Sequence, residues 1–127
     1  MIDENGYRSN VGIVLANAAG QVLWARRVGG RNAWQFPQGG VNRGETPEQA
    51  LYRELHEEVG LRAASVRLLG QTDGWLHYDL PEHMRRNNST PGFVGQKQKW
   101  FLLQFVDEDA AIAVDHSAKP EFDQWCW

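Results

Sequence analysis

Three glutamates that lie close together in the sequence, Glu54, Glu57 and Glu58, have the clearest capacity for chemistry. On a helix, residues three and four positions apart lie on one face, so the three carboxylates would share a single arc. They would also occupy the last turns, where the helix dipole disfavours each anion by about 0.3 to 1 kcal/mol. A divalent cation reverses this unfavourable electrostatics, and hard carboxylate oxygens suit magnesium, calcium or manganese. The spacing therefore indicates a metal site rather than an ordinary solvated acidic face.

The helix that would carry these glutamates has a beginning and an end that can be read from the sequence. Thr46 is a favoured N-cap, Pro47 suits the first helical position, and Gln49 completes a capping box. Gly60 can adopt the left-handed conformation that closes a helix, so we predict a helix from about Pro47 to about Val59. An apolar stripe suited to packing on a sheet is formed by Leu51, Tyr52, Leu55 and Val59.

The segment from Gly39 to Leu61, GGVNRGETPEQALYRELHEEVGL, resembles the Nudix box at every defined position. The resemblance implies hydrolysis of a nucleoside diphosphate linked to another moiety, with catalytic metal ions held by the helix of the box. It assigns the metal ligands to the carboxylates of Glu54, Glu57 and Glu58 and to the backbone carbonyl of Gly39.

Other residues of the box have structural roles by the same resemblance. Glu45 and Arg53 would form an ion pair that holds the loop onto the helix, and Gly60 would end the helix. Sharp turning of the loop before the helix is assigned to Gly39, Gly40 and Gly44, because glycine tolerates unusual backbone conformations.

The segments on either side of the box narrow the resemblance. Together they resemble the bacterial RNA pyrophosphohydrolase subgroup, also described as dinucleoside polyphosphate hydrolases, through GYRSNVGIV, WARR, WQFPQGG, GQKQKWFLLQ and PEFDQW. In that subgroup an acid before the last strand approaches the metals and serves in catalysis, and Glu121 matches it, both as a catalytic residue and as a further metal ligand. Positions associated with triphosphate or nucleotide contacts are matched by Arg8, Arg27 and Gln96. Gln38 and Lys99 complete the expected substrate-binding set.

The resemblance implies a magnesium-dependent enzyme, with manganese or another divalent cation as a substitute, that removes pyrophosphate from the 5′-triphosphate end of RNA and so initiates RNA decay. One alternative is the hydrolysis of diadenosine tetraphosphate and related dinucleoside polyphosphates by the same attack of water on phosphorus. An alternative from another class is an inactive nucleotide- or RNA-binding module. Glu54, Glu58 and Glu121 all qualify to take the proton from the water, and their spacing does not choose between them.

Length and composition indicate one folded domain over residues 1–127, with 42% hydrophobic residues and six tryptophans. A net charge of −3 gives no general attraction for a polyanion, so RNA binding would depend on local basic groups and metal, and no DNA partner is expected. A single cysteine, Cys126, fits a reducing compartment. We expect a cytoplasmic protein without a membrane segment, because no signal pattern opens the chain and no apolar run approaches ~18 residues.

The fold class predicted from the family is α/β, an α/β/α sandwich around a mixed sheet. Strands are predicted over residues 11–16, 21–27, 34–40, 65–69, 75–80 and 100–106. The first two would form a hairpin, with Arg26 and Arg27 on opposite faces if the strand is regular, and Pro37 limits the third to an edge or a bend. The last, which is the most apolar, is the candidate central strand. Alternation before it places Gln96 and Gln98 on one face and Lys97 and Lys99 on the other.

The sequence also gives predictions for a loop over residues 81–92 and for the end of the chain at Trp127. Residues 81–92 are polar and without periodicity, which predicts a long loop whose Arg85 and Arg86 meet either substrate phosphates or only water. Proteins of the Nudix family continue past the position of Trp127 with the rest of a strand and a C-terminal helix. We therefore expect either a truncated chain or a Nudix fold that lacks this helix, with an uncovered aromatic surface that favours aggregation or association.

Overall fold

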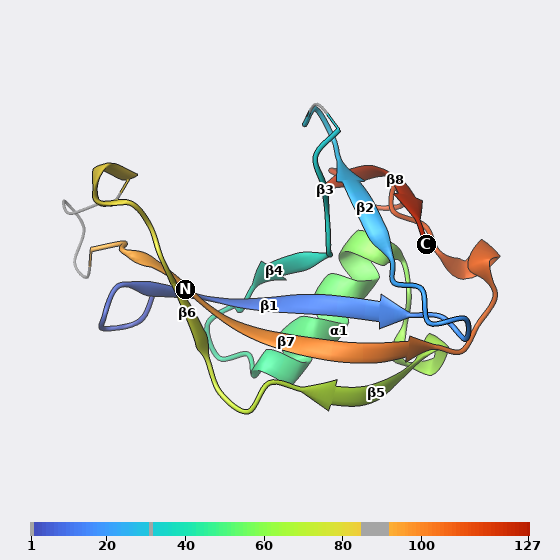
Figure 1. The fold of residues 1–127 in the computed structure, drawn as a ribbon, viewed down its shortest axis with the longest axis horizontal. Coiled ribbons are helices and arrows are strands. Elements are labelled where there is room, and N and C mark those ends of the chain that lie inside the picture. The colour runs from blue at the N-terminus through green and yellow to red at the C-terminus, as the bar shows by residue number, and fades with distance from the viewer. Residues whose placement is uncertain (1, 31, 85–91) are drawn as a thin grey trace.

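The computed structural model describes residues 2–30, 32–84 and 92–127 and contains a larger and a smaller sheet. The larger sheet has the order β4-β1-β7-β5, with β6 also paired to β7. Its strands are β1 (Tyr7–Ala16), β4 (Gln38–Gly40), β5 (Val66–Gln71), β6 (Leu76–Asp79) and β7 (Gly95–Phe105). The smaller sheet has the order β3-β2-β8, formed by β3 (Trp34–Gln35), β2 (Trp24–Arg27) and β8 (Phe122–Cys126). Figure 1 shows the helix α1 (Pro47–Glu54) lying across β1 and β7, with the smaller sheet towards one end.

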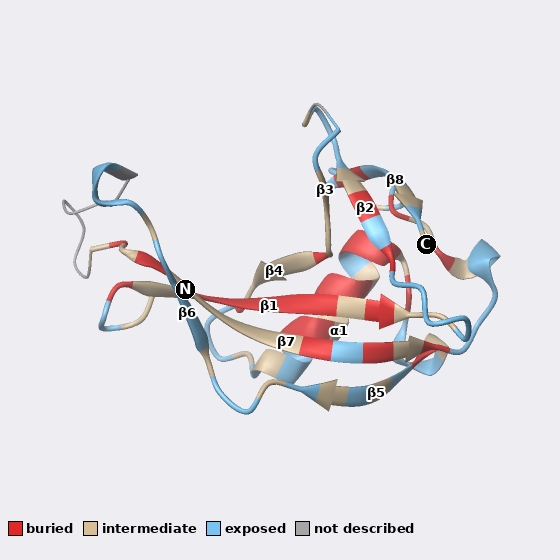
Figure 2. Cartoon of the chain, in the orientation of Figure 1, coloured by how far each residue is buried: buried red, intermediate tan, exposed pale blue. Residues whose placement is uncertain are grey.

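The centre of the larger sheet is the parallel pair of β1 and β7, which confirms the prediction of a central strand near residues 100–106. Their register runs without a shift from Tyr7 beside Gly95 to Ala16 beside Gln104. Buried odd-numbered residues of the pair join the hydrophobic core with α1: Val11, Ile13, Leu15, Phe101 and Leu103. Figure 2 shows β1 buried along most of its length. Even-numbered residues of both strands therefore face away from α1.

The predicted hairpin between residues 11–16 and 21–27 is only partly present. A single bridge joins Ala16 to Val22, and the Leu23 N–H donates to the Leu15 carbonyl at 2.8 Å. The chain then leaves β1, and β2 pairs with β3 and β8. The prediction was wrong because β4 occupies the edge of β1 that the returning strand would need. A register shift between Arg26 and Arg27 also breaks the regular alternation expected for them.

Pro37 lies at a corner, as predicted, and divides the expected strand over residues 34–40 into two. Before it, β3 is an edge strand of the smaller sheet; after it, β4 is an edge strand of the larger sheet. Pro37 is buried, and its carbonyl accepts a hydrogen bond from the Ile13 N–H at 2.9 Å. The corner delivers β4 to the start of the box helix.

The box helix begins as predicted and ends differently. Thr46 forms the capping box with Gln49, through hydrogen bonds of 2.9 and 3.1 Å. After α1 the chain continues as a π-helical turn, Leu55–Val59, and ends at Gly60, whose φ of 78° is left-handed as expected. A π turn contains one more residue per hydrogen-bonded ring than an α turn and often marks a functional site. Short 3-10 turns follow at Ala63–Ser65, Glu82–Met84 and Asp109–Ala111.

Within the described residues α1 is the one α-helix, and it covers one face of the larger sheet. On the other face, Val14, Trp100 and Leu102 contribute to a mostly apolar hollow of about 290 Å³, and Leu102 is 40% exposed. Within residues 2–127 the architecture therefore agrees with the expected α/β fold, and this face of the larger sheet carries no helix among the described residues. No helix in the described ranges is long and apolar enough to cross a membrane.

Candidate active site

All four acids predicted for catalysis line one cavity of about 350 Å³: Glu54, Glu57, Glu58 and Glu121. The first three come from the end of α1 and the π turn, and Glu121 comes from the segment immediately before β8. The Val28 N–H donates to the Glu121 carbonyl at 2.9 Å, so the loop after β2 holds that segment. The structure thus brings a distant acid to the box helix.

Ser117 and Lys119 also line this cavity, and sequence reasoning missed both. Lys119 is two residues before Glu121, in a stretch without a regular pattern. Its side chain is exposed, and no ion pair links it to the four glutamates in the described part of the chain. A positive charge at the edge of an acidic cavity is suited to contact a phosphate group. The position of the lysine two residues before the predicted catalytic acid Glu121 was the signal available in the sequence.

Two of the acids are buried, and burial makes their charged forms unfavourable. Glu58 is 6% exposed and Glu54 is 8% exposed. Burial raises the pKa of Glu58 to about 9, with a further rise from the negative charges of Glu54 and Glu121. The Gln38 N–H donates to Glu58 Oε2 at 3.2 Å and opposes that rise. Burial also raises the pKa of Glu54, against the effect of the neighbouring Arg53 guanidinium.

Arg53 organises the cluster more extensively than the resemblance implied. Its predicted ion pair with Glu45 is present and bidentate, with Nε–Oε2 and Nη2–Oε1 distances of 2.8 and 3.0 Å. Nη1 also donates to Glu54 Oε1 at 2.7 Å and to Glu57 Oε2 at 3.2 Å, and Nη2 donates to the Gly40 carbonyl at 2.7 Å. A guanidinium has five N–H donors, so all of them are used.

The Glu45–Arg53 pair gives a test of this bracing role. Arg53→Lys keeps the charge but loses the planar fork, so we expect the free energy of unfolding at pH 7 to fall by about 1–3 kcal/mol. The Arg53 hydrogen bond holds the pKa of Glu45 below its usual range. A lowered carboxyl pKa stabilises the fold above the unfolded-state pKa, and this contribution is lost as the pH falls through the folded-state value.

Urea denaturation at a series of pH values measures the effect, with Arg62→Lys, at an exposed arginine, as the control. The difference between Arg53→Lys and the wild type should shrink in acid. A loss of the same size at acid and neutral pH would contradict an ionic origin.

The four carboxylates provide the oxygen ligands that a divalent cation prefers, although they do not converge on a common position for the ion. No three His, Cys, Asp or Glu side chains within the described ranges converge to hold an ion as they stand. The reason is visible in the contacts, since Arg53 holds Glu54 and Glu57 and the Gln38 N–H holds Glu58. Four carboxylates on one cavity, with two raised pKa values, nevertheless form a set of hard oxygen ligands that a cation would stabilise. Each of these hydrogen bonds uses one oxygen of its carboxylate, so the second oxygen of Glu54, Glu57 and Glu58 remains available to an ion.

Gly39 leaves room for the Glu54 carboxylate and does not turn the chain sharply as predicted. A Cβ atom on Gly39 would lie 2.1 Å from Cδ of Glu54, so any side chain would displace the carboxylate. Gly39 and Gly40 belong to β4 and do not form a sharp turn, which corrects the prediction. Gly44, with a φ of 78°, does turn the loop as expected. The close approach places the backbone of Gly39 beside a predicted metal ligand.

Most of the predicted substrate contacts gather on the face of the larger sheet that points away from α1. Arg8 and Gln96 are neighbours in the β1–β7 register, and the Arg8 guanidinium lies 5.0 Å from the centre of the Phe93 ring. Gln38 accepts a hydrogen bond of 3.4 Å from the side chain of Gln98. These groups form a polar surface that adjoins β4, the strand that carries Gly39.

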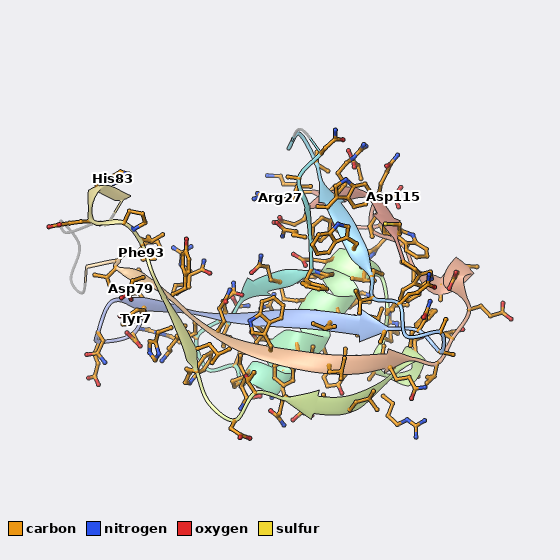
Figure 3. The ribbon with its side chains drawn as sticks, viewed as in Figure 1. Tyr7, Arg27, Asp79, His83, Phe93 and Asp115 are labelled. Carbon is orange, nitrogen blue, oxygen red and sulfur yellow. The ribbon has the colours of Figure 1, made fainter. Side chains whose placement is uncertain are left out.

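The other predicted contacts lie elsewhere. Lys99 is paired with Val11, whose side chain is buried against α1, so this lysine lies on the opposite face from Gln96. Arg27 lies on the smaller sheet in a hollow of about 310 Å³ that it shares with Arg26, which is paired with Asp123 at 2.8 Å. Figure 3 shows Arg27 far from Phe93 along the molecule. Arg85 and Arg86 lie outside the described residues.

Comparison with known proteins shows the family. The NUDIX domain profile matches residues 6–127, and the chain therefore belongs to the Nudix family. The predicted family and α/β fold are confirmed, and the chain is a Nudix hydrolase, related to enzymes that act on pyrophosphate bonds.

Curated relatives refine this class. The chain is 60% identical over 127 residues to the RNA pyrophosphohydrolase of Cellvibrio japonicus, a match that covers all of this chain and 75% of that protein. It is 61% identical to the RNA pyrophosphohydrolase of Pseudomonas aeruginosa, covering all of this chain and 79% of the relative.

Solved structures agree on the fold. The E. coli dihydroneopterin triphosphate pyrophosphohydrolase has a TM-score of 0.72 and 25% identity, over 95% of this chain and 81% of that one. A C. elegans Ap4A hydrolase has a TM-score of 0.68 and 20% identity, over 94% and 78% of the two chains, and supports the fold alone.

Proposed function

We propose that this chain is a magnesium-dependent hydrolase that removes pyrophosphate from the 5′-triphosphate end of RNA in the cytoplasm. The observation that carries the proposal is the single cavity lined by Glu54, Glu57, Glu58 and Glu121. Relatives about 60% identical over the whole chain carry the name RNA pyrophosphohydrolase, which supports RNA as the substrate. Nudix hydrolases generally need divalent cations, and magnesium prefers the oxygen ligands present here.

In this proposal, Glu54, Glu57 and Glu58 hold the ion together with the Gly39 carbonyl. When bound, the cation lowers the pKa of the attacking water and neutralises charge on the phosphate oxygens. Glu121 enters from a different element, is exposed, and makes no ion pair with a described residue. We assign to Glu121 the removal of the proton from the water, since the three acids of the box are committed to the ion. Burial of Glu54 and Glu58 excludes bulk water from one side of the reacting phosphate.

Lys119 provides the positive charge for the departing pyrophosphate in the same proposal. Lys119→Met should lower kcat/KM for a 5′-triphosphorylated oligonucleotide by about tenfold, because it removes one charge-assisted hydrogen bond. Lys119→Arg should keep most of the activity. Arg62→Met removes the same charge at an exposed position outside the cavity and serves as the control. Equal losses in Lys119→Met and Arg62→Met would mean that only the overall charge matters.

The experiment that tests the function compares two substrates with and without magnesium. The protein is incubated with a 5′-triphosphorylated oligonucleotide or with diadenosine tetraphosphate, and pyrophosphate or nucleotide release is measured. Faster hydrolysis of the RNA end supports the proposal, and faster hydrolysis of the dinucleotide would favour the dinucleoside polyphosphate hydrolase. If the folded, magnesium-loaded protein hydrolyses neither, the inactive binding module is the better description.

A further inference from the structure

The loop over residues 115–121 carries two groups of the acidic cavity, Lys119 and Glu121. It follows the buried core residue Val114 and leads directly into β8. Every residue of the loop is exposed or half-buried, so packing against the core contributes little to its position. Lys119 and Glu121 act on a phosphate in the cavity only while the loop stays in place, so the contacts that hold the loop matter for the site.

His116 makes the contact that holds the middle of this loop. Its Nε2 atom is hydrogen-bonded to the His56 carbonyl oxygen, and the two imidazole rings meet edge to face with their centres 5.1 Å apart. Since a carbonyl oxygen only accepts, Nε2 carries the hydrogen and donates it. Within the described part of the chain, one other hydrogen bond links the loop to another element, and it lies at the end of the loop, from the Val28 N–H to the Glu121 carbonyl at 2.9 Å.

The acceptor of the His116 hydrogen bond belongs to the same turn as the box acids. His56 is part of the π turn Leu55–Val59, directly before Glu57 and Glu58. The turn therefore presents carboxylates to the cavity and a carbonyl oxygen to the loop. One side-chain hydrogen bond thus joins the segment that carries the predicted metal ligands to the segment that carries the other charged groups of the site.

The segments at the two ends of the loop are held differently from its middle. Before the loop, the Ala113 N–H donates to the Val59 carbonyl at 2.8 Å, and at its end the Glu121 carbonyl is held by Val28. Both of these hydrogen bonds join backbone groups, which a substitution does not remove. The middle of the loop depends on the imidazole of His116, so one substitution can release it while the ends keep their partners.

We propose that His116 is a positioning residue, which keeps Lys119 and Glu121 at the acidic cavity by holding the loop to the His56 carbonyl. It acts through the two residues that it places and not through a contact of its own with the substrate. The proposal rests on the proposed function, in which Lys119 meets the departing pyrophosphate and Glu121 takes the proton from the water. Both groups act on charge that develops in the transition state, so displacement of the loop lowers kcat and changes KM little.

The first test removes the donor and keeps an aromatic ring beside His56. His116→Phe should lower kcat for a 5′-triphosphorylated oligonucleotide about fivefold, as expected for the loss of one neutral hydrogen bond. His116→Gln supplies an amide N–H of similar reach and should keep most of the wild-type rate, and His116→Ala is the second variant if the phenylalanine variant does not fold. His83→Phe is the control, at an exposed histidine that Figure 3 shows at the opposite end of the molecule from Asp115.

A double-mutant cycle tests whether His116 acts through the loop. The losses of kcat in His116→Phe and Lys119→Met should combine to less than their product, because the second substitution removes one of the groups that the first displaces. Losses that multiply fully would overturn the proposal. Equal losses in His116→Phe and His116→Gln would also overturn it, since the N–H donor would then be irrelevant.

Hydrogen exchange followed by NMR tests the position of the loop without substrate or metal. The Val28 amide should exchange about fivefold faster in His116→Phe and at the wild-type rate in His116→Gln, because its acceptor is the Glu121 carbonyl. The Ile13 amide, which donates to the Pro37 carbonyl at 2.9 Å, should not change and reports on the rest of the fold. Unchanged exchange at Val28 in His116→Phe would overturn the proposal, whereas the expected change would support it even if RNA were not hydrolysed.

Discussion

Glu58→Gln is expected to yield a protein that is more stable than the wild type without metal and at least about a hundredfold slower with it. The stability gain arises because Glu58 is 6% exposed and has its pKa raised to about 9 by burial and by the charges of Glu54 and Glu121. At pH 7 the wild-type carboxyl must take up a proton to fold, and a neutral amide of nearly the same shape removes that cost. The activity loss arises because the amide is a poor ligand for a divalent cation.

The pH dependence of this stability has a definite sign. A carboxyl whose folded-state pKa is raised contributes fully below its unfolded-state pKa, and that contribution is lost as the pH rises towards the folded-state value. The wild type without metal should therefore lose stability between about pH 5 and pH 9, and Glu58→Gln should lose less. At pH 7 the variant should be more stable by about 2–3 kcal/mol.

Urea denaturation with a chelator, and again with magnesium, measures both parts of this prediction. Magnesium should stabilise the wild type strongly and the variant weakly, because the ion replaces the proton on Glu58 and the variant lacks this carboxylate ligand. Glu108→Gln, at an exposed glutamate outside the cavity, is the control. A less stable Glu58→Gln protein, or one with near-normal turnover, would contradict the assignment of Glu58 as a buried ligand.

Gly39→Ala is expected to reduce activity by about a hundredfold or more through a single added methyl group. The new Cβ would lie 2.1 Å from Cδ and 2.3 Å from Oε1 of Glu54, so the carboxylate or the strand must move. Arg53 also holds Glu54 at 2.7 Å, which limits the directions in which the carboxylate can yield. Overpacking of this kind also destabilises proteins by about 1–3 kcal/mol.

The neighbouring glycine provides a matched control for this variant. Gly40→Ala adds the same methyl group one residue later in β4, where the nearest atom would be 3.9 Å away. Its activity and stability should stay close to those of the wild type. Similar losses in the two variants, measured as kcat/KM and as the urea midpoint, would show that β4 is sensitive to any change and that the contact with Glu54 is not the cause.

Sequence reasoning predicted those parts of the site that depend on local spacing. The capping box at Thr46, the left-handed Gly60 and the Glu45–Arg53 ion pair each follow from residues a few positions apart, and each is present. Glu121 was predicted only through the family resemblance, because nothing in its local sequence distinguishes it from a surface acid. The structure shows that it reaches the box helix through β8 and the smaller sheet.

The parts that sequence reasoning missed depend on contacts between distant segments. β4 pairs with the edge of β1 that β2 would otherwise occupy, and β2 pairs with β3 instead. This arrangement depends on residues 38–40, which lie outside the segment that predicted the hairpin. The steric role of Gly39 depends on the Glu54 side chain that packs beside its strand. Lys119 belongs to the site only because an irregular loop returns to the box helix. Periodicity and propensity describe one segment at a time, so they do not contain this information.

The wide turn from Leu55 to Val59 restricts how the length of this chain can change. Removing one residue from the turn would allow it to close with ordinary α geometry, and the residues beyond the turn would keep roughly their present direction, but Glu57 and Glu58 would change position relative to Glu54. Carboxylates that now point into one cavity would be separated, while the cap at Thr46 and the glycine at the end would remain. Insertions and deletions in this turn should therefore reduce activity in proteins of this kind, even where all the glutamates are kept.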